Sequence, residues 1–180
     1  MPTISNQRSF NGFDEKVKRL GLGTRYEEAL STLSFQLIIE QRRFANGTKP
    51  IRQWIDEAFS GLAGWSQKKS GGIDWQAQNV QGATLGVEVQ VSGRSDLLAV
   101  DVLHFAEAIR KGEVDAGLII VPDDEMSRYL TDRTPNFRTA LRHIVNGKAE
   151  DLPIQIVAFR HNGVGDAIAK MRTNLGRSRE

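Results

Sequence analysis

Three polar side chains in the middle of the chain have the types and spacing of a metal-dependent catalytic site. Asp74 follows a pair of glycines, and Glu88 and Gln90 flank Val89 in the run TLGVEVQV. Side chains alternate between the two faces of a strand, so Glu88 and Gln90 share one face while the valines point the other way. If Asp74 lies on the neighbouring strand, its carboxylate reaches Glu88.

Two carboxylates held this close repel each other unless a positive group lies between them. A hard cation with oxygen ligands, such as Mg²⁺, is suited to that place. The alternative is an amphipathic strand whose polar face meets solvent. We favour the metal site because an amphipathic helix and the apolar run GLIIVP follow the strand, and such neighbours usually cover both faces of a sheet.

The order of these motifs resembles that of the PD-(D/E)XK nucleases, with Gln90 in place of the lysine that the pattern usually carries. TLGVEVQVS is similar to the catalytic strand of restriction endonucleases of the BglII and BstYI type, and GGIDWQ resembles the segment that bears their first aspartate. GLIIVP and DLPIQIVAF look like two later strands of the same family. The resemblance covers roughly residues 50–160.

The resemblance implies an α/β, restriction-endonuclease-like fold with a central mixed β-sheet flanked by helices. It also implies Mg²⁺-dependent hydrolysis of double-stranded DNA at a short palindromic site, with a GATC core. Asp74, Glu88 and Gln90 are then catalytic, and Asp74, Glu88 and the Val89 carbonyl hold the metal. Gln90 does not titrate, so it orients the attacking water by hydrogen bonding. A homodimer is implied as well, because two-fold symmetry matches a palindrome.

Two other functions share these residues. A repair or structure-specific nuclease would use the same core without reading a palindromic site. A DNA-binding or protein-interaction module would keep the fold without catalysis, although the intact set Asp74, Glu88 and Gln90 argues against it.

A helix that precedes Asp74 in the sequence is a candidate to supply a further carboxylate. In nucleases of the resembling fold such a helix often supplies a carboxylate to the metal site, and Asp56 and Glu57 occupy a helical pattern ahead of Asp74. We take Glu57 as the extra acid. The alternative is that both residues are solvated helix charges.

Several basic and polar residues are candidates for contacts to DNA. Arginine and asparagine can read guanine and adenine in the major groove, and lysine and arginine contact phosphates. Ordinary solvated side chains are the alternative for each of them. The candidates lie beside the acid-bearing strands and in the turn-rich segment SRYLTDRTPNFR: Lys68, Lys69, Ser92, Arg94, Arg128, Arg133 and Asn136.

Length and composition fit one folded domain over residues 1–180, with an N-terminal extension at 1–23 and a basic tail at 161–180. The resemblance implies that this is a single nuclease domain. The chain has no cysteine, which excludes disulfides and thiolate metal sites. Its net charge of +2 means that a DNA-binding surface requires uneven placement of lysine and arginine. With no long apolar run and no apolar signal core, we expect a cytoplasmic protein with no membrane partner.

Periodicity and capping signals give the expected elements. The helix over 96–111, capped by Ser95, has apolar residues on more than one face. It therefore packs on the sheet and on a second surface, either the dimer partner or the rest of the monomer. The other expected helices span 24–46, opened by a Thr24–Glu27 capping box, then 50–62, 125–130 and 137–145, and the expected strands span 65–68, 73–76, 84–91, 114–121 and 153–159.

Overall fold

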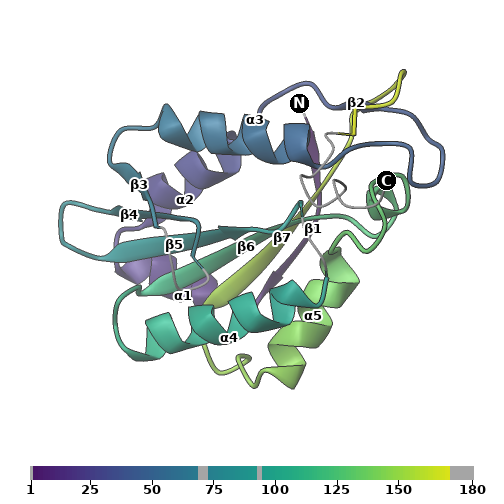
Figure 1. The fold of residues 1–180 in the computed structure, drawn as a ribbon. Helices are drawn as coiled ribbons and strands as arrows, with labels where there is room; N and C mark the ends of the chain where they lie inside the picture. The colour runs from purple at the N-terminus through teal and green to yellow at the C-terminus, as the bar shows by residue number, and fades with distance from the viewer. Residues whose placement is uncertain (1, 69–72, 93–94, 171–180) are drawn as a thin grey trace, which may run out of the picture.

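A six-stranded mixed sheet forms the centre of the protein, in the order β1-β7-β6-β5-β4-β3 (Figure 1). The computed structural model describes residues 2–68, 73–92 and 95–170. Strands β5, β6 and β7 run parallel to one another. At the two edges β1 pairs antiparallel with β7, β4 pairs antiparallel with β5, and β3 pairs antiparallel with β4. The predicted α/β class with a central mixed sheet flanked by helices is confirmed. The strands are β1 (Thr3–Ser9), β3 (Trp65–Gln67), β4 (Trp75–Gln78), β5 (Thr84–Val89), β6 (Ala116–Pro122) and β7 (Ile154–Arg160).

Helices cover both faces of this sheet (Figure 1). One layer contains α1 (Phe13–Arg19), α2 (Gly23–Ser31) and α3 (Lys49–Ser60), and the other contains α4 (Leu97–Arg110) and α5 (Phe137–Asn146). A short 3₁₀ turn, η1 (Met126–Arg128), follows β6. Two further short strands, β2 (Ile38–Ile39) and β8 (Gly163–Val164), pair in parallel outside the main sheet. No helix in the described part of the chain is long and apolar enough to cross a bilayer.

The central strands are apolar because both of their faces are covered. Every residue of β6 is buried. Leu118 and Ile120 pack in the core beneath α1–α3, and Ile119 and Val121 pack in the core beneath α4 and α5. The alternation explains how one continuous apolar run serves two hydrophobic cores.

Helix α4 rests on the sheet through an aromatic ring that needs two glycines beneath it. A Cβ atom on Gly117 would lie 2.7 Å from Phe105 Cζ, and one on Gly86 would lie 3.0 Å from Phe105 Cε2. Phe105 is fully buried. The bare backbone of β5 and β6 at these positions therefore sets how closely α4 approaches the sheet.

The predicted helix over 24–46 is wrong in length, because α2 ends at Ser31. The Ser31 hydroxyl donates to the Glu28 carbonyl at 2.6 Å, and the Thr32 hydroxyl donates to the Ala29 carbonyl at 2.6 Å. Hydroxyl side chains that bond the preceding turn compete with continuation of the helix. The helix also starts earlier, at Gly23, with no side-chain cap.

Two other local predictions differ from the structure. Residues 3–9, which we expected to lie in an extension, form the edge strand β1, paired from Thr3 opposite Arg160 to Ser9 opposite Gln155 with a shift of register between Ile4 and Asn6. This strand lacks an apolar alternation, so only backbone pairing identifies it. The cap of α4 is Asp96 rather than Ser95, with no side-chain cap hydrogen bond. The remaining predicted elements are present within a few residues of their expected bounds.

The contact of Phe105 with the glycine backbone gives a test of this architecture. We expect Gly117→Ala to lower the free energy of unfolding by about 1–3 kcal/mol, because the added methyl group forces the ring away from the sheet. Urea denaturation followed by circular dichroism measures the change. Gly23→Ala is the matched control, since a Cβ there meets no atom within 4 Å; equal stabilities for the two variants would contradict the account.

Candidate active site

The candidate site lies where β4 separates from β5. Trp75 is the first residue of β4 and pairs with Val87. One residue earlier, the Asp74 amide still donates to the Val87 carbonyl at 2.9 Å. Beyond that point, the backbone N–H and carbonyl of Val89 face the side from which β4 has departed. They require other partners.

Side chains from two elements provide those partners. The Val89 N–H donates to Asp74 Oδ2 at 2.8 Å. The guanidinium of Arg52, from α3, donates through Nη1 to the Val89 carbonyl and pairs through Nη2 with Asp74 Oδ1 at 2.7 Å. The aspartate and the arginine therefore close the end of the sheet that the strands leave open.

Glu88 and Gln90 lie on the opposite face of β5 from the valines, as the alternation predicts. Val87 and Val89 belong to the core beneath α1–α3. Gln90 Nε2 donates to Glu88 Oε1 at 2.8 Å and also to Asp101 Oδ2 of α4. Both amide hydrogens of Gln90 therefore point at carboxylates. The side-chain oxygen remains to accept a hydrogen bond from another group.

Three carboxylates, those of Asp74, Glu88 and Asp101, lie close enough in the site to influence one another. Glu88 is 4% exposed, and burial, followed by the charges of Asp74 and Asp101, holds its pKa well above the ordinary value. The pKa of Asp101 is raised too, first by burial and then by Asp74. Glu88 and Asp101 are therefore harder to ionise in this site, and a cation bound beside them would favour their charged forms.

The donor set of Asp74, Glu88 and the Val89 carbonyl suits a hard cation in chemistry. Among the residues that the structure describes, no three histidine, cysteine, aspartate or glutamate side chains form a group able to hold a metal ion. The backbone carbonyl would therefore have to complete the set, with water. The Asp74 and Val89 oxygens already contact one positive group, the Arg52 guanidinium.

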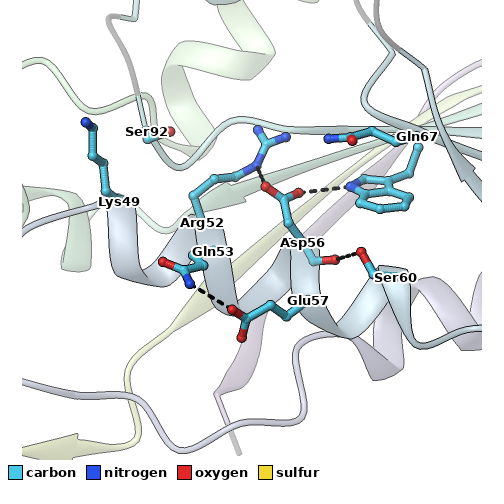
Figure 2. Close-up of a pocket in the computed structure, with 9 residues that line it drawn as sticks. Lys49, Arg52, Gln53, Asp56, Glu57, Ser60, Gln67 and Ser92 are labelled. Carbon is cyan, nitrogen blue, oxygen red and sulfur yellow. Dashed lines mark hydrogen bonds and ion pairs between the residues drawn. The ribbon is translucent and has the colours of Figure 1, made fainter. Parts of the chain in front are cut away.

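Arg52 is held in turn by α3 and β4. Figure 2 shows its Nε on Asp56, a contact of 2.8 Å between Nε and Oδ2. Asp56 Oδ1 accepts from the indole N–H of Trp75 at 2.9 Å. A cleft of about 420 Å³ lies beside these residues, and it is also lined by Lys49, Gln53, Glu57, Ser60, Gln67 and Ser92.

The structure does not bring Glu57 to the carboxylates. Its side chain points away from Arg52 and accepts from Gln53 Nε2 at 2.8 Å on the exposed side of α3 (Figure 2). The neighbouring Asp56 instead joins the group through Arg52. The acid that α3 places nearest the site is thus the other candidate of the pair.

Two of the candidate DNA contacts lie near the end of β5. Ser92 lines the cleft. The Arg133 carbonyl accepts from the Ser95 N–H at 2.9 Å, so the loop that carries Arg133 lies against the segment following β5. The Arg133 side chain is 60% exposed and 3.9 Å from Asp132, which leaves its guanidinium open to a phosphate or a base.

The other candidates are placed differently. Lys68 Nζ pairs with Glu113 Oε2 at 2.8 Å. Arg128 is exposed on η1. Asn136 caps α5, since its Oδ1 accepts from the Thr139 N–H at 2.9 Å and its Nδ2 donates to the Ser127 hydroxyl at 3.2 Å. A base contact by Asn136 would have to replace these bonds. Lys69 and Arg94 lie outside the described residues.

Reasoning from the sequence missed Asp101 and Arg52. Asp101 stands between Leu98 and Phe105, the buried residues three before and four after it on α4. An acid on the buried face of an amphipathic helix is a signal that could have identified it. Arg52 offers a weaker signal, its spacing of four from Asp56, which is common on solvated helix faces.

The raised pKa of Glu88 predicts how stability depends on pH in EDTA. Between the unfolded value of 4.5 and the raised folded value, the folded state binds more protons, so stability falls as pH rises through that window. The Glu88→Gln variant has no carboxylate to ionise at this position, so its stability does not fall for this reason. At pH 8 we expect the variant to be more stable than the parent by about 1–2 kcal/mol, measured by urea denaturation across pH.

Glu57→Gln is the matched control, because it removes an exposed carboxylate from α3 without touching the buried group. We expect its stability profile to follow the parent at every pH. A Glu88→Gln variant that is less stable than the parent at pH 8 would contradict the proposed repulsion.

Comparison with known proteins identifies a family for the chain. The sequence model of one family, described as restriction endonuclease BglII/BglIII, matches residues 24–159, which is most of the chain and includes every acid of the site. The curated proteins gave no match. Restriction endonucleases of this family bind double-stranded DNA and generally use a divalent metal ion, usually Mg²⁺. The chain therefore belongs to the BglII/BglIII restriction endonuclease family and has a restriction-endonuclease-like fold, as its motifs predict.

Proposed function

We propose that the protein is a type II restriction endonuclease that hydrolyses double-stranded DNA at a short palindromic site with Mg²⁺. The observation that carries the proposal is the convergence of Asp74, Glu88 and Gln90 where β4 separates from β5, in a chain of this family. A GATC core within the site follows from the family resemblance alone.

Asp74, Glu88 and the Val89 carbonyl would hold the metal ion. A bound Mg²⁺ supplies a Lewis acid for the scissile phosphate and lowers the pKa of a bound water. The role of the protein side chains would be to position the attacking water. Gln90 turns its amide hydrogens toward Glu88 and Asp101, so its oxygen would accept a hydrogen bond from the attacking water and orient it.

The DNA would approach over the end of the sheet that carries the site. Lys49 and Ser92 line the cleft beside Arg52, and Arg133 projects from the adjacent loop. Hydroxyl, ammonium and guanidinium groups of this kind bind phosphate oxygens. Arg128 would extend the same positive surface along η1.

We propose further that the enzyme acts as a homodimer through α4. Leu97, Val100 and Leu103 follow one another at intervals of three along this helix and are 52%, 46% and 51% exposed. Three large apolar side chains on one side of a helix are typical of a surface that meets a partner. Two copies related by a two-fold axis would place two sites on the two strands of a palindrome.

Removal of the Asp74 carboxylate tests the catalytic proposal. We expect Asp74→Asn to cut plasmid DNA at least about a thousandfold more slowly with Mg²⁺, because several kcal/mol of transition-state stabilisation are lost with the metal ligand. The asparagine oxygen can still accept from the Val89 N–H, so the fold is retained. Gel electrophoresis of cleavage products over time measures the rate.

Glu57→Gln is the control for this experiment and should cut at the parent's rate. Discrete fragments from the parent support site-specific cleavage, and their ends give the sequence. A smear that disappears in Asp74→Asn would replace the restriction enzyme with a repair or structure-specific nuclease. Cutting that survives in Asp74→Asn would refute the assigned site.

A charged residue introduced on the exposed side of α4 tests the proposed dimer. We expect Leu103→Asp to reduce the mass in sedimentation equilibrium from that of two chains to that of one, since an unpaired carboxylate would be buried against an apolar partner. Val80→Asp is the matched control, because Val80 is fully exposed on the turn between β4 and β5. A dimeric Leu103→Asp variant would exclude this face as the interface.

A further inference from the structure

Arg52 contacts two of the three groups that are proposed to hold the metal ion. Its guanidinium lies 2.7 Å from Asp74 Oδ1 and donates to the Val89 carbonyl. It comes from α3, on the face of the sheet opposite Glu88 and Gln90. The arginine thus binds the same oxygens that a divalent cation would use.

Arg52 and a divalent cation cannot both occupy these oxygens. Mg²⁺ takes oxygen ligands at about 2.0–2.1 Å in a nearly octahedral arrangement. A guanidinium that kept its hydrogen bonds to the same carboxylate and carbonyl would then lie within a few ångströms of the ion. Two positive charges at that distance repel strongly in a partly buried site. One must leave for the other to bind.

Arg52 could remain beside a metal ion only if it lost its proton, and it does not. Its Nη2 lies 2.7 Å from Asp74 Oδ1 and its Nε lies 2.8 Å from Asp56 Oδ2, so two carboxylates favour the charged guanidinium. The side chain therefore stays charged at every working pH. Only a movement of the guanidinium can free the Asp74 and Val89 oxygens.

The surroundings provide a tether and a space for this movement. Asp56 holds the Arg52 Nε at 2.8 Å and is itself held by the Trp75 indole at 2.9 Å. Neither contact involves the proposed metal ligands. The cleft of about 420 Å³ opens beside Arg52 and continues to Lys49 and Ser92, so the Nη atoms can rotate into it while Nε remains on Asp56 (Figure 2).

We propose that Arg52 is an internal counter-cation that a divalent metal ion displaces from Asp74 and Val89 into the cleft, where its guanidinium binds a DNA phosphate. The inference rests on the proposed metal site. In the metal-free protein Arg52 fixes the ligands in place and offsets their charge. After the exchange it contributes, from α3, the positive side chain that Gln90 cannot supply within the strand motif.

Metal binding measured without DNA tests this exchange. Mn²⁺ shares the preference of Mg²⁺ for oxygen ligands, and its free form is counted directly by electron paramagnetic resonance. At pH 8 we expect Arg52→Gln to bind Mn²⁺ about tenfold more tightly than the parent, because the ion no longer competes with a charge-assisted hydrogen bond. Circular dichroism verifies the fold of each variant.

Two controls separate this inference from the site on which it rests. Arg25→Gln removes an arginine that likewise joins a carboxylate, Glu28, to backbone carbonyls, those of Ala63 and Gln78; it should bind Mn²⁺ as the parent does. Asp74→Asn should lose the binding. If Asp74→Asn binds as well as the parent, the metal site itself is wrong and the exchange fails with it.

The decisive comparison is then between Arg52→Gln and the parent. Equal or weaker Mn²⁺ binding by Arg52→Gln, with binding still dependent on Asp74, would overturn the exchange while leaving the metal site in place. Tighter binding that appears equally in Arg25→Gln would also overturn it, since the effect would then follow from overall charge.

A measurement on the unaltered protein avoids dependence on the Arg52 variant. In ¹⁵N NMR of the arginine side chains, we expect saturating Mg²⁺ to shift or broaden the Arg52 Nη signals while the Nε signal, held by Asp56, is retained. Arg52→Lys provides the assignment. Nη signals that are unchanged at saturating Mg²⁺ would show that Arg52 stays on Asp74 and would refute the displacement.

Discussion

Repulsion between like charges is the constraint on which this structure depends. Asp74 and Glu88 are held together at the end of paired β4 and β5, and Asp101 approaches from α4 over the same strand. Burial intensifies the repulsion because water no longer screens it. The positive group among these residues, Arg52, comes from a helix on the far face of the sheet, and its contacts to Asp74 and the Val89 carbonyl bring the two layers of the protein together at the site.

The same contacts explain why the strands can part at this point. A backbone N–H and carbonyl without partners would destabilise the end of β5. The Asp74 carboxylate and the Arg52 guanidinium satisfy the two groups of Val89, so the sheet can open there without loss of hydrogen bonding. Asp74, the proposed metal ligand, and Arg52 are thus also the residues that complete the backbone pairing of Val89.

Much of this arrangement could be predicted from the sequence, because it depends on local patterns. The apolar runs of β6 and β7 identified the buried strands, Pro50 marked the start of α3, and the alternation in β5 placed Glu88 and Gln90 on one face. Strand β1 could not be predicted, because its exposed polar side chains carry no period. The end of α2 was missed because the hydroxyls of Ser31 and Thr32 bond the preceding turn.

The missed site residues share a different cause. Asp101 and Arg52 act across the packing of one element on another, and their partners are 11 and 37 positions away in the hydrogen bonds to Gln90 and Val89. Spacing along a single strand contains no information on such pairs. The choice between Glu57 and Asp56 likewise could not be made from the sequence. Adjacent helix residues point about 100° apart, and only the packing of α3 decides which of the two faces Arg52 and Trp75.

Helix α4 is constrained from two directions at once. Phe105 sits against the bare backbone at Gly86 and Gly117, and one turn earlier Asp101 holds Gln90. The opposite side of the same helix carries the exposed Leu97, Val100 and Leu103. A helix moves as a rigid rod over this length, so a displacement of its outer side is passed through Asp101 to the Gln90 amide without crossing a flexible loop. If the proposed dimer forms through this side of α4, association would therefore also set the position of Gln90.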